Sequence, residues 1–385
     1  MIKITFALLC AAAAFAQPGP SRVVSPEVLP DHRITFRISA PKATEVVLRL
    51  GDANPASHSM TKGEGGVWSV TLGPFEPAVY IYYFMLDGAK TIDLSNPNTK
   101  VGTSIDASLV EVRSDPPRFD QVQAVPHGSI NIHTYASSAS KTQRGLYIYV
   151  PAEYYTQPTK RYPVLYLWHG GGGAEHDWSR DGRAGVILDN LIAQKKAVPM
   201  LVVMPNNVAG APAPGVAAAA STAPAAAPGA GGTNYAPLKQ DLLEDILPFV
   251  SKNYRTIENR ENRAMAGLSA GGGTTMNVGI STLDMFAWIG EFSSGIFGGT
   301  AGYPQQFDIG KIAPDFYKDP AATNKKLKLF YMSCGVDDPR MPFQKKALEG
   351  FQNHKINVTF AEFPGAHEWT VWRHSLADFG AKLFR

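Results

Sequence analysis

One pentapeptide in the sequence has residue types and spacing that point to nucleophilic catalysis. Gly267-Leu268-Ser269-Ala270-Gly271 fits the pattern G-x-S-x-G, between an apolar, strand-like run and small residues that can begin a helix. Such a turn strains the serine backbone, and its glycines omit Cβ atoms that would collide with the strand and the helix. The pattern predicts that Ser269 is a nucleophile at a helix N-terminus, which favours developing negative charge.

A glycine run supplies a second part of such a site. The stretch HGGGG, residues 169–173, directly follows the apolar run VLYLW. Acyl transfer needs two backbone N–H donors for the developing oxyanion, one after the nucleophile and one from an early strand-to-helix loop. We expect Ala270 and Gly171 to provide them, with His169 supporting the loop. Because the run lacks G-x-x-x-x-G-K-[ST] and a dinucleotide fingerprint, a phosphate cradle is disfavoured.

Candidates for the acid and the base follow in the chain order serine, acid, histidine that is typical of this motif. The stretch CGVDD, residues 334–338, ends an apolar run, and His367 follows the apolar run VTFAEFP. Ser269 would attack an ester carbonyl, and His367 would pass its proton to the leaving alcohol. Either Asp337 or Asp338 would hold the imidazole, and the other would cap the next helix.

Composition and spacing exclude several other classes of protein. The chain has 385 residues with 36 Lys+Arg against 33 Asp+Glu, a formal net charge of +3, and no basic stripe, so no nucleic-acid partner is expected. Two cysteines give no disulfide framework and no Cys-rich zinc module. His367-Glu368 with His374 does not fit H-E-x-x-H, so we expect neither a metal nor a cofactor.

The N-terminus has the pattern of an export signal. An apolar stretch over residues 4–14 follows a lysine, and Ala14-Phe15-Ala16 fits a cleavage site, which predicts a signal peptide over residues 1–16. Cleavage would remove Cys10 and leave Cys334 as a lone thiol. No later stretch is apolar enough to cross a membrane. We therefore expect a secreted or periplasmic protein without a membrane partner.

The remainder divides into two domains of different pattern. Residues 21–113 contain runs such as RITFRIS, VWSVTL and VYIYYFML that alternate with period two, which predicts a small antiparallel β-sandwich. Residues 114–128 contain Asp-Pro-Pro and are predicted to be a linker. Residues 129–385 alternate apolar runs with amphipathic ones, which is typical of an α/β domain with a mostly parallel sheet. Residues 209–232 are nearly all Ala, Pro, Gly, Ser, Thr and Val. This composition predicts a disordered surface insertion or, alternatively, a lid over the active site.

The second domain resembles a known family over residues 127–385. It resembles the esterase D-like α/β-hydrolases of carbohydrate esterase family 1, including feruloyl and acetylxylan esterases. The stretches that carry this resemblance are PHGSINIHTYASSAS, YPVLYLWHGGGGAEHDW, LLEDILPFVSKNYR, AMAGLSAGGGTTMNVG, FSSGIF, CGVDD and PGAHEWTVWRHSL. The resemblance implies an α/β-hydrolase fold, Ser269 as nucleophile, His367 as base, Asp338 rather than Asp337 as acid, and Gly171 as oxyanion donor. Around the mouth we expect three tryptophans that can stack on an aromatic acyl group or a sugar, with core packing as the alternative for each: Trp178, Trp369 and Trp372.

The first domain resembles carbohydrate-binding module family 48, an immunoglobulin-like module. The residues that carry this are RITFRISAPKATEVVL, GVWSVTLGPFEPAVYIYYFMLDG and the turn at residues 93–98, although Pro77-Ala78 stand where the family has glycine. No aromatic pair for sugar binding can be matched, so a packing and orienting role is expected. The combined hypothesis is a secreted serine esterase whose partner is a plant polysaccharide ester. The alternative is the same fold acting on a siderophore lactone or a small ester, and the sequence predicts no oligomeric state.

Overall fold

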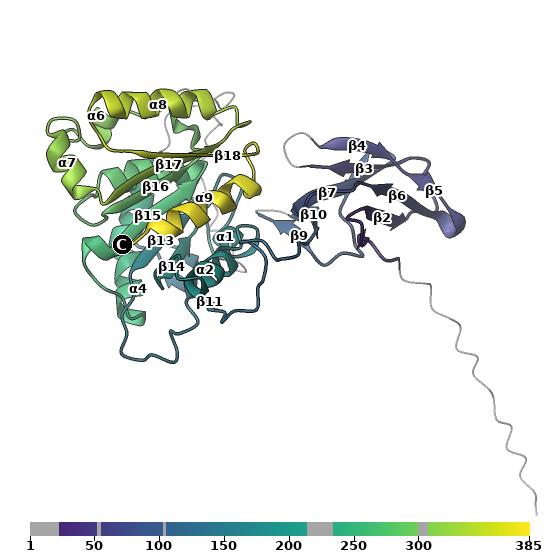
Figure 1. Ribbon diagram of the computed structural model, residues 1–385, viewed down its shortest axis with the longest axis horizontal. Helices are drawn as coiled ribbons and strands as arrows, with labels where there is room; N and C mark the ends of the chain where they lie inside the picture. The colour runs from purple at the N-terminus through teal and green to yellow at the C-terminus, as the bar shows by residue number, and fades with distance from the viewer. Residues whose placement is uncertain (1–22, 52–54, 103–104, 214–233, 299–306) are drawn as a thin grey trace, which may run out of the picture.

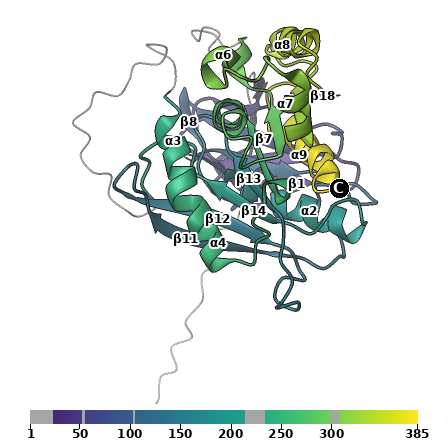
Figure 2. The ribbon, with the colours of Figure 1, turned by 90° about the vertical axis from the view of Figure 1, so that its left-hand side faces the viewer.

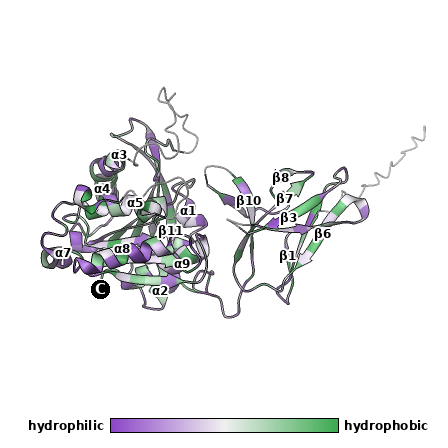
Figure 3. Cartoon of the chain, turned by 90° about the horizontal axis from the view of Figure 1, so that it is seen from above, coloured by the Kyte–Doolittle hydropathy of each residue, from purple (hydrophilic) through white to green (hydrophobic). Residues whose placement is uncertain are grey.

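The chain folds into two parts that lie side by side (Figures 1 and 3). The computed structural model describes residues 23–51, 55–102, 105–213, 234–298 and 307–385. The predicted signal peptide, residues 1–16, lies outside the described residues, and so do residues 214–232 of the predicted insertion. Within the described ranges, no helix is both long and apolar enough to span a bilayer.

The first part consists of two antiparallel sheets, with strand orders β1-β2-β6-β5 and β4-β3-β7-β10-β9, and β8 pairs with β7. One short 3-10 turn, η1 (Glu64–Gly66), precedes β6. The strands are β1 (Glu27–Val28), β2 (Ile34–Ser39), β3 (Val46–Leu50), β4 (Ala56–Ser59), β5 (Thr61–Lys62), β6 (Val67–Leu72), β7 (Val79–Leu86), β8 (Ala89–Thr91), β9 (Thr99–Val101) and β10 (Ile105–Glu111).

Alternating side chains explain why these two sheets pack face to face. Ile34 and Phe36 on β2 point to the same side and are fully buried, as are Tyr82 and Phe84 on β7 of the other sheet. Phe36 and Tyr82 meet edge to face with ring centroids 4.8 Å apart, which joins the two sheets through one core. The predicted alternation of RITFRIS and VYIYYFML is present; membership of an immunoglobulin-like family stays a prediction.

The second part is built on one mixed eight-stranded sheet with the order β11-β12-β14-β13-β15-β16-β17-β18. The pairs β11–β12 and β12–β14 are antiparallel, and all pairs from β14 to β18 are parallel. Six parallel strands therefore end at the same edge of the sheet. The strands are β11 (Ser129–Ala136), β12 (Gln143–Val150), β13 (Val164–Trp168), β14 (Leu201–Pro205), β15 (Arg263–Leu268), β16 (Trp288–Phe292), β17 (Leu329–Gly335) and β18 (Thr359–Phe363).

Helices cover both faces of this sheet, because its strands are apolar on both sides. The continuous helix α3-η2-α4 packs on one face through an apolar stripe that includes Leu238, Leu242 and Ile246, and Figure 2 shows it alongside β11 and β12. Helices α2 and α9 cover the other face. The helical segments are α1 (Asp177–Arg180), α2 (Ala184–Ala193), α3 (Ala236–Gln240), η2 (Asp241–Ile246), α4 (Leu247–Asn253), η3 (Arg260–Asn262), α5 (Ala270–Thr274), η4 (Thr275–Gly279), η5 (Gly295–Phe297), α6 (Ile309–Ile312), α7 (Pro320–Lys326), α8 (Met341–Asn353) and α9 (Trp369–Lys382).

The predicted linker, residues 114–128, packs closely against the second part. Asp120 and Gln121 are almost fully buried. The Asn190 side chain on α2 donates hydrogen bonds to the carbonyl oxygens of Phe119 (2.9 Å) and Gln121 (2.8 Å). Arg118 bonds to Asp120 and also to the carbonyl oxygen of Pro77 in the first part. The segment thus connects to both parts through specific polar contacts.

Candidate active site

The turn between β15 and α5 holds Ser269 in a strained conformation. Its φ is 51° and its ψ is −114°, a backbone conformation that residues other than glycine rarely adopt. The Ser269 N–H donates to the carbonyl oxygen of Phe292 at the end of β16 (2.8 Å), which anchors the turn to the sheet. The turn therefore carries the serine at the sheet edge where the parallel strands end.

The glycines on either side of Ser269 are required by close backbone contacts. A Cβ on Gly267 would lie 2.4 Å from the carbonyl of Gly271, and one on Gly271 would lie 2.5 Å from the carbonyl oxygens of Trp168 and His169. Because backbone atoms cannot yield as a flexible side chain can, alanine at either position would displace the turn. The close contacts that the pattern G-x-S-x-G predicts around the serine are therefore present in the structure.

A hydrogen-bonded chain links Ser269, His367 and Asp338. The Ser269 hydroxyl lies 2.9 Å from His367 Nε2, and His367 Nδ1 donates to Asp338 Oδ2 at 2.7 Å. Asp338 follows β17 and is buried, whereas Asp337 beside it is exposed and makes a backbone contact to Gly365. The structure thus brings Asp338, and not Asp337, to the imidazole.

The surroundings of Asp338 keep its carboxyl ionised. Burial by itself would raise the pKa of Asp338, but the hydrogen bond and charge of His367, together with Arg340, hold that pKa below its ordinary value. Arg340 contributes its backbone N–H (3.0 Å) and a guanidinium N–H (3.2 Å) to Asp338 Oδ1. With both oxygens engaged, the carboxylate holds the imidazole with Nε2 free to accept a proton from Ser269.

The glycine loop lies beside the serine. A Cβ built on Gly170 would lie 3.5 Å from the Cβ of Ser269, and one on Gly171 would lie 3.9 Å from the Cβ of Ala270. Gly171 and Ala270, the two expected oxyanion donors, are therefore neighbours. Ala270 opens α5, where the first N–H groups have no partner within the helix.

His169 braces this loop from beneath. Its Nδ1 donates to the carbonyl oxygen of Gly170 (2.8 Å), and its Nε2 accepts from the N–H of Asn207 (2.8 Å), which fixes the tautomer. Burial lowers the pKa of His169 to about 4, so the ring is neutral at pH 7. The expected supporting role of His169 agrees with these contacts.

A buried polar network continues below the loop. Arg144 donates to the carbonyl oxygen of Asn206 (2.6 Å) and lies 3.3 Å from Asp241 Oδ2, and the Asn206 amide donates to Glu175 (2.6 Å). This network joins β12, the end of β14 and η2 to the glycine loop. Arg144 Nε, Glu175 Oε1 and Asp241 Oδ1 are buried without a hydrogen-bond partner among the described residues, so this network is only partly satisfied.

Two of the three expected tryptophans line the pocket, and the expectation for Trp178 is wrong. Trp369 and Trp372 line a cavity of about 320 Å³ together with Ser269 and His367. Trp178 is 1% exposed, donates its indole N–H to the carbonyl oxygen of Trp168 (2.9 Å), and meets Trp369 edge to face. It is in the core because α1 turns its side chain toward the sheet, so it supports Trp369 instead of meeting substrate.

Sequence reasoning missed a buried carboxyl group in this pocket. Asp177 lines the pocket, and burial raises its pKa to about 7, with Asp181 and Glu175 adding to the rise. A Cβ on Gly173 would lie 2.1 Å from Asp177 Oδ2, so the carboxyl fills the space beneath the glycine loop. The sequence signal for this aspartate is its position a few residues after the glycine run, in GGGGAEHDW.

Sequence reasoning also missed a contribution from the first domain. Lys100, Val101 and Gly102 at β9, together with Asp106 on β10, line the same pocket as Ser269. No local motif marks them, because their position depends on how the two domains meet. In the described part of the chain, no three His, Cys, Asp or Glu side chains are grouped to hold a metal ion.

Comparison with known proteins agrees with this geometry. A family model described as "Putative esterase" matches residues 137–327. An endo-1,4-beta-xylanase/feruloyl esterase of Xylanibacter ruminicola is 28% identical over 374 residues, which is 96% of this chain and 47% of that protein. An acetyl esterase of Caldicellulosiruptor saccharolyticus is 26% identical over 156 residues, 35% of this chain and 59% of that protein. The chain spans about half the length of the curated relatives just described.

Solved structures share the fold. A carbohydrate esterase family 1 ferulic acid esterase from Anaeromyces mucronatus covers 69% of this chain and 94% of its own, with a TM-score of 0.56 and 24% identity. An enterobactin esterase from Shigella flexneri covers 91% of this chain and 92% of its own, with a TM-score of 0.61 and 15% identity. The second domain therefore has the fold of these solved structures.

Proposed function

We propose that this protein is a secreted serine esterase that hydrolyses plant cell-wall esters, as a feruloyl or acetylxylan esterase. The observation that carries the proposal is the hydrogen-bonded chain from Ser269 through His367 to the buried Asp338. Serine, histidine and aspartate side chains that are hydrogen-bonded in this way perform nucleophilic acyl transfer in unrelated hydrolases. One histidine acts first as base toward the serine and then as acid toward the leaving alcohol.

In the first step, the Ser269 oxygen attacks the ester carbonyl carbon while its proton moves to His367 Nε2. The C–O bond to the alcohol then breaks, and the imidazolium returns that proton to the departing oxygen, which leaves an acyl-enzyme. Water repeats the sequence, with His367 as base, and frees the acid and Ser269. Asp338 stabilises the imidazolium because its carboxylate is ionised and accepts from Nδ1.

The tetrahedral intermediates carry a negative oxygen that two backbone N–H groups would bind. Ala270 and Gly171 are the proposed donors, since they are neighbours beside Ser269. Ala270 stands at the N-terminus of α5, where the helix adds positive potential, although so short a helix adds little. Removing one such donor typically costs about 3–4 kcal/mol of transition-state stabilisation.

Support for the class of substrate comes from the relatives and from the pocket. The Xylanibacter ruminicola relative, aligned over nearly the whole chain, is a feruloyl esterase joined to a xylanase. The cavity of about 320 Å³ is at the small end of ligand pockets, which occupy roughly 300–1,000 Å³. Trp369 and Trp372 give it aromatic surface for a phenolic acyl group or a sugar ring.

A substrate panel with the Ser269→Ala variant as the blank tests the proposal. The panel contains methyl ferulate, acetylated xylan, a short aryl acetate, a catechol-type siderophore lactone and a peptide amide. We expect hydrolysis of methyl ferulate or acetylated xylan to exceed that of the aryl acetate. Preference for the lactone would overturn the cell-wall substrate while leaving the serine mechanism, and turnover by the blank would overturn both.

The proposed secretion rests on the export pattern at residues 1–16. Expression of the full chain with its own N-terminus, followed by mass measurement of the protein outside the cytoplasm, tests it. We expect a mature chain that begins near Gln17. A cytoplasmic protein that retains residues 1–16 would contradict the prediction.

A further inference from the structure

A carboxyl group is buried behind the nucleophile turn, at a position where the sheet is otherwise apolar. Glu291 lies on β16 two residues after Ile289, so the two side chains point to the same face of the sheet. Ile289 belongs to the apolar core on that face, and Glu291 is likewise fully buried. Burying a carboxylate without a partner for its charge is costly. The acyl-transfer steps at Ser269 make no direct use of this group.

One oxygen of Glu291 joins the turn after β16 to helix α8. Oε1 accepts hydrogen bonds from the backbone N–H of Ser294 and from the side-chain amide of Gln344 in the first turn of α8 (2.9 Å). The same amide also donates to the carbonyl oxygen of Ser294 (2.9 Å). The stem of Glu291 lies close to α5 as well, since a Cβ built on Gly272 would be 3.3 Å from its Cγ. Glu291 therefore contacts three segments at once.

These segments bear directly on the catalytic residues. The carbonyl oxygen of Phe292, the neighbour of Glu291 on β16, accepts the N–H of Ser269 (2.8 Å). Helix α8 begins at Met341, whose N–H donates to the carbonyl oxygen of Asp338 (2.9 Å). A displacement of Glu291 would thus reach the nucleophile through β16 and the catalytic acid through α8.

The second oxygen of Glu291 indicates which charge state the site accepts. Oε2 is buried and has no hydrogen-bond partner among the described residues. A negative oxygen at this point would be removed from water without a donor to replace it, whereas a protonated oxygen carries no charge. The geometry therefore favours Glu291 as a neutral acid.

The ionisable groups around Glu291 do not supply a positive charge. Those that interact with it are neutral or negative: Asp338, Cys334 and Tyr331. The basic side chains of Arg340 and His367 bond to Asp338 instead. Burial raises the pKa of Glu291 to about 8, and the charge of Asp338 adds to the rise. The two carboxyl groups thus hold one negative charge between them, and Asp338 carries it.

We infer that Glu291 is a positioning residue of the esterase site, which as an uncharged acid holds the ends of β16 and α8 together and leaves Asp338 as the one negative charge behind His367. This inference rests on the proposed esterase function. Loss of the proton from Glu291 would place a second negative charge near Asp338, in a region shielded from water. We expect the surrounding turn to relax, so that hydrolysis declines as pH rises through the range in which Glu291 ionises.

The test compares the pH dependence of the wild type with that of Glu291→Gln. Glutamine keeps the size of the side chain and its acceptor oxygen but cannot ionise. We would measure kcat and KM from about pH 6 to about pH 10 on a short aryl acetate, whose acyl group does not titrate, and subtract the rate of Ser269→Ala. Glu349→Gln, at an exposed position on the same helix, is the matched control. Thermal melting at each pH checks that the variants are folded.

We expect kcat of the wild type and of Glu349→Gln to fall at least about threefold between roughly pH 7 and pH 9.5, and kcat of Glu291→Gln to stay within about twofold. KM should change little, because Glu291 does not line the pocket around Ser269. A wild type without the decline, superimposable profiles, or a Glu291→Gln variant that loses activity equally at every pH would overturn the inference.

A second variant and a spectroscopic measurement give independent tests. The Gln344 amide favours the ionised form of Glu291, so Gln344→Met should move the decline to higher pH, and an unmoved decline would overturn the inference even if Glu291→Gln does not fold. The infrared difference spectrum of wild type minus Glu291→Gln should show the carbonyl band of a protonated carboxyl group near neutral pH, and its absence would likewise overturn the inference. These outcomes leave Ser269-dependent hydrolysis intact, whereas its absence in the wild type would reveal failure of the proposed esterase function.

Discussion

Two unlike walls face Ser269. The first is the edge of the large sheet, where Ser269, Asp338 and His367 follow the ends of β15, β17 and β18. The second is the β9–β10 pair of the other domain, which meets the glycine loop through a hydrogen bond and a backbone approach at Gly102. The first wall is fixed by strand register within one sheet, and the second by contacts between domains. The two sides of the pocket are therefore held in place by different kinds of interaction.

The strongest test of the first wall is removal of the nucleophile. Ser269→Ala should lower kcat by on the order of a million-fold, because the three residues of such a chain act as a unit. Folding should be unaffected, since among the described residues the Ser269 side chain has a hydrogen bond to His367 alone. Steady-state hydrolysis of methyl ferulate measures the effect, and a near-normal rate would remove Ser269 from the mechanism.

A matched pair of substitutions tests the choice of carboxylate. Asp338→Asn should lower kcat on the order of 10⁴-fold, because an amide cannot stabilise the imidazolium and favours the wrong tautomer. Asp337→Asn should stay within about twofold of wild type, since Asp337 is exposed. The two variants are compared in kcat on one substrate, and the reverse ranking would contradict the assignment.

The boundary between the walls is tested by adding a single carbon. Gly102→Ala introduces a Cβ that would lie 2.6 Å from the Gly172 carbonyl oxygen, so one backbone must move. We expect the first domain to yield, with roughly a tenfold loss of kcat/KM on feruloylated xylotriose and less than threefold on methyl ferulate. Equal losses would mean that the glycine loop moves instead. Gly350→Ala on α8, where a Cβ enters open space, is the control.

The last expected effect is on stability and not on activity, and it concerns Asp177 beneath the glycine loop. Burial raises its pKa to about 7, against an ordinary value near 3.9, so the folded chain binds the proton more tightly than the unfolded chain. Its contribution to stability is fully present at low pH and is lost as pH rises toward 7, by up to about 4 kcal/mol. Asp177→Asn should flatten the decline of melting temperature between pH 5 and pH 8. An unchanged slope would contradict the raised pKa.

The part of the site that could be predicted from the sequence is the part that local sterics determine. The glycines around Ser269 serve a turn whose contacts involve residues a few positions away or on the neighbouring strand. His367 was predicted from its position after an apolar run, and it lies within hydrogen-bond distance of Ser269. From the residues alone Asp337 and Asp338 were equivalent, because which of them is buried depends on how β17 ends beside the His367 loop.

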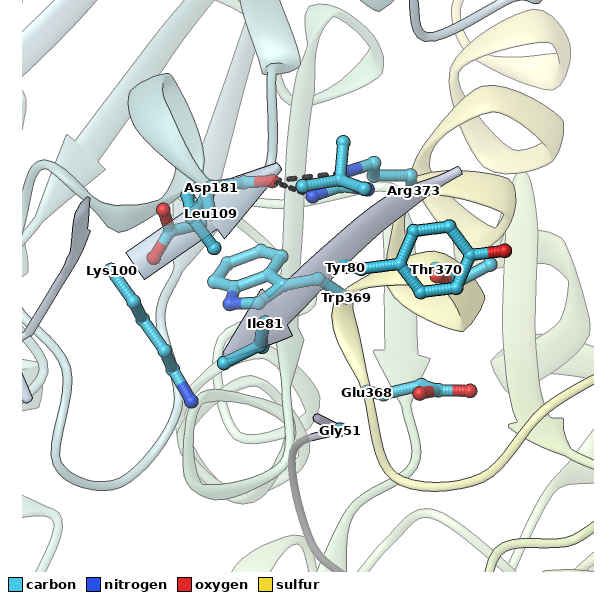
Figure 4. A pocket seen from close by; sticks show the side chains of 11 residues that line it. Gly51, Tyr80, Ile81, Lys100, Leu109, Asp181, Glu368, Trp369, Thr370 and Arg373 are labelled. Carbon is cyan, nitrogen blue, oxygen red and sulfur yellow. Dashed lines mark hydrogen bonds between the residues drawn. The ribbon is translucent and has the colours of Figure 1, made fainter. Parts of the chain in front are cut away.

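The tryptophans show where prediction from the sequence failed. Trp178 follows the glycine run and Trp369 follows the histidine motif, so their positions in the sequence do not distinguish them. Helix α1 directs Trp178 into the core, whereas Trp369 at the start of α9 lines both the pocket that contains Ser269 and a second hollow lined by Tyr80 and Ile81 (Figure 4). A helix only four residues long has too little periodicity to show which face is buried.

By itself, the sequence determined the reactive residues and their order, because nucleophile turns, strand alternation and a glycine run are local patterns with local physical causes. Only the tertiary structure decided that Lys100 and Asp106 share a pocket with Ser269, and that Asp177 is buried beneath the loop. Those facts depend on how two separately patterned domains pack together. Such packing depends on shape and polar contacts between residues far apart in the chain. A periodic pattern within one segment does not indicate those contacts.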